Sequence, residues 1–161
     1  SLNMYMLSQF SGVQPNEITF TAVLVACSHA GLVMEGLHFF NFVMRHDSTG
    51  CITLNLKHFS TMVDLLGRAG DFKVLKNMLE MMPMRADLTF WLCLLNVCRI
   101  HGNVDLGEKA FDHAVSLQPE HPAAYVFMSN IYADAGLQEC VTELKRSMRM
   151  LGFEGVWKEL E

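Results

Sequence analysis

The sequence has no excess of positive charge and few charged side chains of either sign. It carries 12 Lys and Arg against 17 Asp and Glu, for a net charge of −5, and charged residues make up only 18% of the 161. A domain that holds nucleic acid by bulk electrostatics normally presents a basic stripe. Its absence excludes strong binding through phosphate attraction alone, so any RNA contact must be local or must depend on sequence upstream of this chain.

The sequence also lacks the motifs of disulfide frameworks, metal centres and membrane spans. Its five cysteines form no CxxC pair, and an odd number suits a disulfide framework poorly, so we expect reduced thiols in an intracellular protein. None of the seven histidines stands in an HxE or HExxH string, which excludes the zinc site of a cytidine deaminase. We expect no catalytic residue, no metal and no cofactor. Apolar runs end well before the ~18 residues that a bilayer requires, so we expect no membrane contact.

What the sequence does contain is a repeat of aromatic residues and glycines. Each of four aromatics is followed by a glycine after 11 residues, and successive units are 39, 32 and 34 residues apart. The pairs are Phe20 with Gly31, Phe59 with Gly70, Trp91 with Gly102 and Tyr125 with Gly136. A period between about 20 and 50 residues is typical of stacked repeats.

Each repeat predicts two helices. The aromatic opens an apolar stretch of helical length, as in 20–27 and 91–98, and the glycine allows the left-handed turn that ends a helix. The next segment predicts the second helix. Its apolar stripe is clearest near the C-terminus, at Leu137, Cys140, Val141, Leu144, Met148 and Leu151. Such pairs bury their stripes only against neighbours, so we expect an all-α fold, an α-solenoid of stacked antiparallel helical hairpins.

The array begins in the middle of a repeat. Leu2, Met6 and Phe10 share one face before Gly12, which predicts the second helix of an earlier hairpin. We therefore expect a piece of a longer protein.

Several strings resemble the C-terminal region of plant pentatricopeptide repeat (PPR) proteins of the PLS subfamily. They include PNEITFTAVLVACSHAGLVMEG in 15–36, LKHFSTMVDLLGRAG from residue 56, WLCLLNVCRIHGNVDLGEKA from residue 91 and AAYVFMSNIYADAG from residue 123. The resemblance implies a PPR/TPR-like superhelix with six segments. These are the second helix of a truncated upstream repeat (1–14), a long-type repeat (15–55), a short-type repeat (56–87), two TPR-like extension motifs (88–121 and 122–155) and a C-terminal tail (156–161).

The resemblance also implies a function. Such proteins act in a mitochondrion or chloroplast as site-specificity factors for C-to-U RNA editing, with upstream repeats reading single-stranded organellar RNA. The extension motifs would dock a DYW-type cytidine deaminase and multiple organellar RNA editing factors, and residues 88–155 would serve as that docking module. The C-terminal half is acidic, since 88–161 carry 6 Lys and Arg against 10 Asp and Glu. A transit peptide would lie upstream.

The resemblance implies that two positions in each repeat face RNA: the residue after the aromatic and the residue that closes the repeat. The RNA-binding candidates are Thr21, Asn55, Ser60, Asp87 and Asn16. By resemblance to the family's recognition code, Thr21 with Asn55 would favour A, and Ser60 with Asp87 would favour G. The asparagines and the aspartate also suit ordinary helix N-caps, which is the alternative interpretation.

Base reading should stop near residue 87. Leu92 and Val126 follow the next two aromatics and cannot hydrogen-bond a base. They are candidates for protein docking, together with Met81, Met82 and Trp157. Two other hypotheses stay open: a helical scaffold that binds proteins without RNA, and part of a self-contained deaminase whose catalytic segment lies beyond residue 161.

Overall fold

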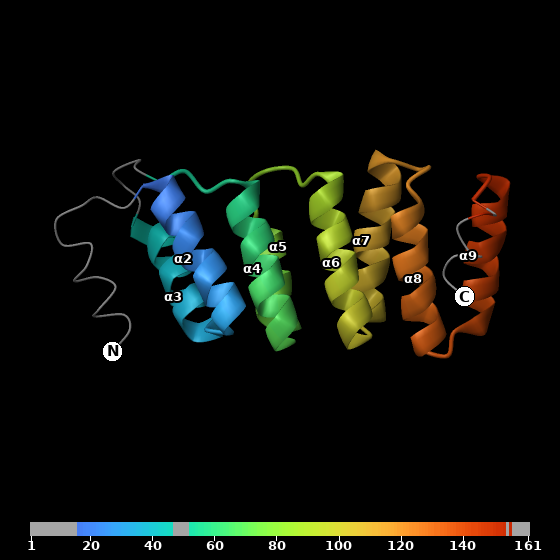
Figure 1. The fold of residues 1–161 in the computed structure, drawn as a ribbon, viewed down its shortest axis with the longest axis horizontal. Coiled ribbons are helices and arrows are strands. Elements are labelled where there is room, and N and C mark those ends of the chain that lie inside the picture. The colour runs from blue at the N-terminus through green and yellow to red at the C-terminus, as the bar shows by residue number, and fades with distance from the viewer. Residues whose placement is uncertain (1–15, 47–51, 154, 156–161) are drawn as a thin grey trace. The chain divides into compact units, whose positions relative to one another are not determined.

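A computed structural model describes residues 16–46, 52–153 and 155, and within these residues the chain forms eight α-helices and no strand (Figure 1). The helices are α2 (Glu17–Ala30), α3 (Val33–His46), α4 (Leu56–Ala69), α5 (Phe72–Met81), α6 (Leu88–His101), α7 (Val104–Leu117), α8 (Pro122–Asp134) and α9 (Gln138–Met150). The all-α prediction is confirmed. The helix predicted in 1–14 and the docking candidate Trp157 lie outside the described residues.

The glycines of the repeat end helices as predicted. Gly31, Gly70 and Gly102 follow α2, α4 and α6 with φ of 68°, 72° and 67°, in the left-handed region that a side chain disfavours. Gly136 adopts φ of 74° at the turn into α9. Each glycine therefore reverses the chain into the second helix of a hairpin.

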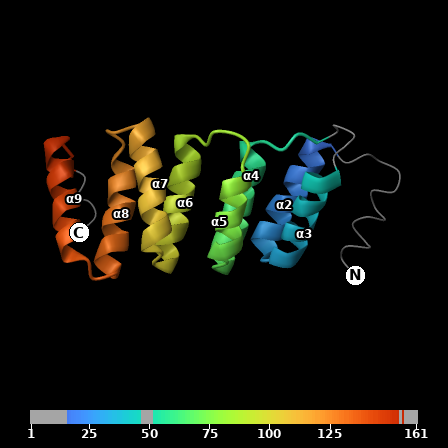
Figure 2. The ribbon, with the colours of Figure 1, turned by 180° about the vertical axis from the view of Figure 1, so that it is seen from behind.

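The chain divides into two compact units, residues 1–85 and residues 86–161. In the first unit, α2 and α4 pack side by side and form one layer, with α3 and α5 behind them (Figures 1 and 2). In the second unit, α6 packs against α7 and α8, and α8 also contacts α9. First helices thus lie next to first helices within a unit, as stacking of hairpins requires.

Two glycines inside second helices let neighbouring helices approach closely. A Cβ on Gly36 of α3 would lie 2.4 Å from Leu65 Cδ2 of α4, and a Cβ on Gly107 of α7 would lie 3.0 Å from Ile131 Cδ1 of α8. Both glycines also face a cysteine of their own hairpin, Cys27 or Cys98. The same contact therefore joins one hairpin to the first helix of the next in each unit.

In one of the four repeats, the buried aromatic ring is not the one that the aromatic–glycine spacing predicts. Phe20 and Phe59 are fully buried, and Tyr125 is buried with its hydroxyl donating to the carbonyl of Pro119 at 2.9 Å. In α6, however, the buried ring is Phe90 rather than Trp91. Trp91 is half-buried and stacks on His113 of α7, with ring centroids 4.1 Å apart.

The apolar stripe predicted in α9 is shorter than the sequence pattern. Val141, Leu144 and Met148 are buried, whereas Leu137 and Leu151 at the two ends remain 41% and 37% exposed. Both leucines flank the helix as its terminal caps.

Candidate nucleic-acid interface

The candidate interface begins with Asn55, which caps α4. Its side-chain oxygen accepts hydrogen bonds from the backbone N–H groups of Lys57, at 3.0 Å, and His58, at 3.3 Å. Its amide nitrogen donates to the carboxylate of Glu17 in the first turn of α2. The residue predicted to close the long-type repeat therefore links the N-terminal ends of two adjacent first helices.

His58 joins this cap to Thr21. The backbone N–H of Asn55 donates to His58 Nδ1 at 3.1 Å, so Nδ1 is unprotonated and the neutral ring carries its proton on Nε2. Nε2 lies 2.9 Å from Thr21 Oγ1 and donates to it. The Thr21 hydroxyl in turn donates to the carbonyl of Glu17 at 2.9 Å. Glu17, Thr21, Asn55 and His58 thus form one network across α2 and α4.

The electrostatics of this network favour a neutral imidazole. His58 is completely buried and packs against the ring of Phe20, with centroids 4.9 Å apart. Burial lowers the pKa of His58 below its ordinary value, outweighing the carboxylate and backbone of Glu17, which act in the opposite direction. Lys57 lowers it further. The proton on Nε2 is therefore held in one place near neutral pH.

Ser60 lies on the same pair of helices and lines a cleft of about 230 Å³. Its hydroxyl donates to the carbonyl of Leu56 at 2.9 Å. The cleft is lined by α2 and α4 residues Val25, Ser28, His29, Lys57, Ser60, Thr61 and Asp64. Asp64 accepts a hydrogen bond from the Ser28 hydroxyl. It also forms an ion pair with Arg68, whose Nε lies 3.0 Å from Asp64 Oδ1. Hydroxyl, carboxylate and ammonium groups therefore share this cleft.

Asn16 and Asp87 act as helix N-caps. Asn16 Oδ1 accepts from the backbone N–H of Thr19 at 2.9 Å, and Asp87 Oδ1 accepts from that of Phe90 at 2.8 Å. The capping interpretation of these residues is confirmed, and both remain exposed. Ser60 belongs to the first unit and Asp87 to the second, so their joint action on one base stays a prediction.

The docking candidates Leu92 and Val126 are half-buried on α6 and α8. These two helices pack together, and Arg99 of α6 lies over the ring of Phe127 of α8, with its guanidinium carbon 5.8 Å from the ring centroid. Arg99 also donates to Asn96 Oδ1, through Nη2 at 2.9 Å. Aliphatic side chains thus occupy the positions that carry hydroxyls in the first unit.

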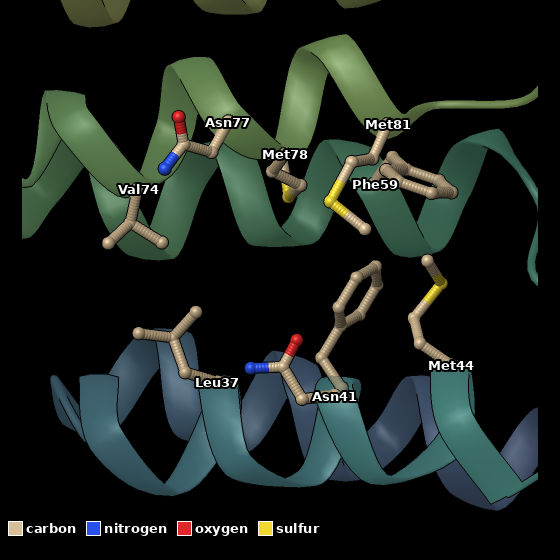
Figure 3. Close-up of a pocket in the computed structure, with 9 residues that line it drawn as sticks. Leu37, Asn41, Met44, Phe59, Val74, Asn77, Met78 and Met81 are labelled. Carbon is tan, nitrogen blue, oxygen red and sulfur yellow. The ribbon is translucent and has the colours of Figure 1, made fainter.

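One of the two methionine candidates, Met81, lines an apolar cleft of about 110 Å³ between α3 and α5 (Figure 3). Met44 from α3 and Met81 from α5 point toward one another across it, and Met81 is 65% exposed whereas Met78 is buried. Met82 follows α5 and is half-buried, outside the lining of this cleft. The cleft opens on the layer of second helices, away from the layer that carries Thr21.

Sequence reasoning missed His58 and Glu17. His58 stands three residues after the cap Asn55, and this Asn-x-x-His spacing forms a reciprocal capping box, which was a readable signal for its ring orientation. The contact with Thr21 spans 37 residues and follows only from the stacking of α2 on α4. Within the described residues, no group of three His, Cys, Asp or Glu side chains could hold a metal ion, and no helix there is long and apolar enough to cross a bilayer.

Comparisons with known proteins agree on the family. The E motif family model matches residues 101–156. Among similar sequences are Arabidopsis thaliana pentatricopeptide repeat-containing proteins, one 46% identical over 85% of this chain and 22% of its own length. A chloroplastic one is 39% identical over 98% and 20%, and a mitochondrial one is 42% identical over 96% and 22%. The chain thus spans about a fifth of the length of these relatives.

A solved structure shares the fold. The crystal structure of the pentatricopeptide repeat protein PPR10 from maize matches with a TM-score of 0.68 over 93% of this chain and 22% of that chain. The sequence identity is 21%. Together with the stacked hairpins, this likeness confirms the predicted α-solenoid.

Proposed function

The chain belongs to the pentatricopeptide repeat family, in the PLS type that carries an E motif, and on this premise we propose that the layer formed by α2 and α4 contacts single-stranded RNA. The observation that carries the proposal is the network of Thr21, His58 and Asn55, which brings the two expected base-reading residues of one repeat to adjacent helix ends. Unpaired bases are read through hydrogen bonds to their exposed edges, and these side chains offer such groups.

The RNA would be organellar and the contact would set the site of C-to-U editing. Relatives named as chloroplastic and mitochondrial support the organellar part of this proposal. Two repeats supply too few contacts for useful affinity by themselves, so the upstream repeats of the full-length protein would supply most of the binding energy. The chain would contribute specificity at its own nucleotides.

The test is a selection of RNA ligands from a random-sequence pool by the full-length protein. Ser60→Asn, with Asp87 unchanged, should move the preference at one nucleotide from G to U, because by resemblance to the family's recognition code an asparagine with an aspartate would favour U. Thr142→Asn is the matched control, since the Thr142 hydroxyl also donates to a carbonyl four residues earlier in an exposed helix of the second unit. An unchanged G preference in the Ser60 variant would exclude base reading by this repeat.

We further propose that the second unit docks the deaminase or other editing factors. Leu92 and Val126 support this, because they present aliphatic carbons where the first unit presents hydroxyls. The experiment is a binding titration between the full-length protein and purified multiple organellar RNA editing factor or DYW-type deaminase. Leu92→Ser with Val126→Thr should weaken binding ~10-fold, as loss of two buried apolar contacts predicts. Equal affinity of the variant would contradict docking at these residues.

A further inference from the structure

We propose that the apolar cleft between α3 and α5 is a redox modification site. At this site a hydroperoxide oxidises Met44 and Met81 to methionine sulfoxide, which loosens the packing of one hairpin on the next. Methionine sulfoxide is returned to methionine by dedicated reductases, so the change is reversible. The proposal goes beyond the RNA contact proposed above and does not rest on it.

Met44 and Met81 differ from the other exposed methionines in where they lie. Among the described residues, Met34 and Met150 are 73% and 84% exposed, but neither lines this cleft. Met44 of α3 and Met81 of α5 line it from opposite walls and point toward one another (Figure 3). They are 36% and 65% exposed, so a dissolved peroxide reaches both sulfur atoms. Met78, which also lines the cleft, is buried.

The floor of the cleft is a contact between the two hairpins. Phe40 of α3 meets Phe59 of α4 edge to face, with ring centroids 5.3 Å apart, and both rings are buried. Long side chains in a helix lean back over the preceding turn, so Met44 leans toward Phe40, which stands four residues earlier. A thioether is polarisable and packs well on aromatic rings. In the reduced protein the two methionines therefore cover this contact from both sides.

Oxidation changes one atom in each methionine. The thioether sulfur attacks one oxygen of the peroxide, so that a sulfur–oxygen bond forms and the oxygen–oxygen bond breaks. The second oxygen leaves with the proton of the first, as water when the oxidant is hydrogen peroxide. The sulfur loses two electrons, and the peroxide gains them. The product is a polar, chiral side chain in place of a flexible apolar one.

Two asparagines offer the oxidised side chains a partner on their own helix. Asn41 lines the cleft three residues before Met44, and Asn77 lines it four residues before Met81. Residues at these spacings are neighbours on one helix face. The sulfoxide oxygen accepts hydrogen bonds, and an asparagine amide supplies N–H donors, whereas a polar oxygen left over the phenyl rings without a partner costs free energy. Oxidation therefore withdraws each methionine from the hairpin contact and holds it to its own helix.

The experiment measures amide hydrogen exchange in the full-length protein before and after treatment with hydrogen peroxide. Peptide mass spectrometry should show one added oxygen on Met44 and one on Met81, with Met78 unmodified. Exchange in α3, α4 and α5 should quicken by on the order of 10-fold, which corresponds to about 1.4 kcal/mol of local stability. Exchange in α6 and α7 should not change. Treatment of the oxidised protein with methionine sulfoxide reductases should restore the slow exchange.

Two pairs of leucine variants separate the cleft from general oxidation. Met44→Leu with Met81→Leu keeps the side chains apolar and of similar volume, but leucine has no sulfur to oxidise. In this pair, exchange in α3, α4 and α5 should not respond to peroxide. Met34→Leu with Met150→Leu is the matched control, because it removes two exposed methionines that lie outside the cleft. This control should respond to peroxide as the parent does.

Three results would overturn the proposal. The first is the absence of added oxygen on Met44 and Met81 under conditions that fully oxidise Met34 and Met150. The second is unchanged exchange in α3, α4 and α5 of parent protein that carries both sulfoxides. The third is a response of the Met44→Leu, Met81→Leu pair equal to that of the parent. The second result is obtained on the parent sequence, so it holds even if the leucine pair folds poorly.

Discussion

The two units share a scaffold and differ in the chemistry of equivalent positions. Each pairs first helices with second helices, and each uses a glycine, Gly36 or Gly107, where the next first helix approaches. The residue after the ring is Thr21 or Ser60 in the first unit, and Leu92 or Val126 in the second. The scaffold therefore accommodates both hydroxyl and aliphatic side chains at these positions, and the functions proposed for the two units differ there.

The difference extends to how the first helices contact each other. Between α2 and α4, the contact includes a buried imidazole with hydrogen bonds at both nitrogens. Between α6 and α8, it includes a cation–π contact of Arg99 with Phe127. Hydrogen bonds at both imidazole nitrogens fix the orientation of donors and acceptors, whereas the cation–π contact uses the ring face of Phe127 and orients no donor or acceptor on that side chain. A reader of bases needs the former, and a protein-docking surface can use the latter.

The largest expected effect concerns the rings of the first helices. Phe59→Ala and Phe90→Ala should each lower the free energy of unfolding by ~3–5 kcal/mol, because both rings are fully buried. Trp91→Ala should cost only ~1–2 kcal/mol, since its ring is half-buried and stacks on His113. Urea denaturation of each variant measures these losses. If Trp91→Ala lowered the free energy of unfolding more than Phe90→Ala does, Trp91 would be the core ring of α6, as the sequence spacing predicts.

The aromatic–glycine spacing shows how much of the fold could be predicted from the sequence. The spacing of aromatic and glycine correctly located the hairpins, because glycine is required where φ is positive and an apolar ring is required in the core. It could not choose between Phe90 and Trp91, which are adjacent and both aromatic. The choice depends on how α7 and its His113 pack on α6, which no local pattern encodes.

The candidate site, too, could be predicted only in part from the sequence. Asn16, Asn55 and Asp87 were recognisable as caps because a short polar side chain before an apolar run satisfies free amide groups. The role of His58 was not, because it depends on Thr21 of the preceding hairpin. A residue whose partner lies on another repeat becomes visible only when the helices are stacked.

An intermediate effect concerns the N-caps of α6 and α8, the two first helices of the second unit. His121 occupies the N-cap of α8 without a side-chain hydrogen bond, and its Nδ1 is buried with no partner among the described residues. His121→Asp should stabilise the protein by ~0.5–1 kcal/mol, because aspartate can accept from the first turn of the helix. Asp87→Ala should instead cost about 1 kcal/mol by removing the bond to Phe90. Thermal denaturation measures the change in stability of both variants. If His121→Asp lowered the stability, the packing of the imidazole would contribute more than the hydrogen bond of an aspartate cap.

The smallest effect is an opposite response of the two units to pH. In the first unit, burial lowers the pKa of His58 below its ordinary 6.5, so the unfolded chain takes up the proton first. Stability from this group is complete above about pH 6.5 and falls as the pH drops toward the lowered value. In the second unit, burial raises the pKa of Tyr132 above its ordinary 10, and the hydrogen bond to Glu108 raises it further. The unfolded chain then loses the phenolic proton first, so stability falls as the pH rises above about 10.

Two variants separate these responses. Tyr132→Phe should flatten the alkaline loss, leaving the smaller part due to Tyr125, whose pKa burial also raises. His58→Gln should flatten the acid loss, because glutamine has no proton to gain. Urea denaturation at pH ~5.5, ~7.5 and ~10.5 measures both. If His58→Gln lost stability in acid as the parent does, His58 would not be the group whose protonation opposes folding, and burial would not lower its pKa in the folded protein.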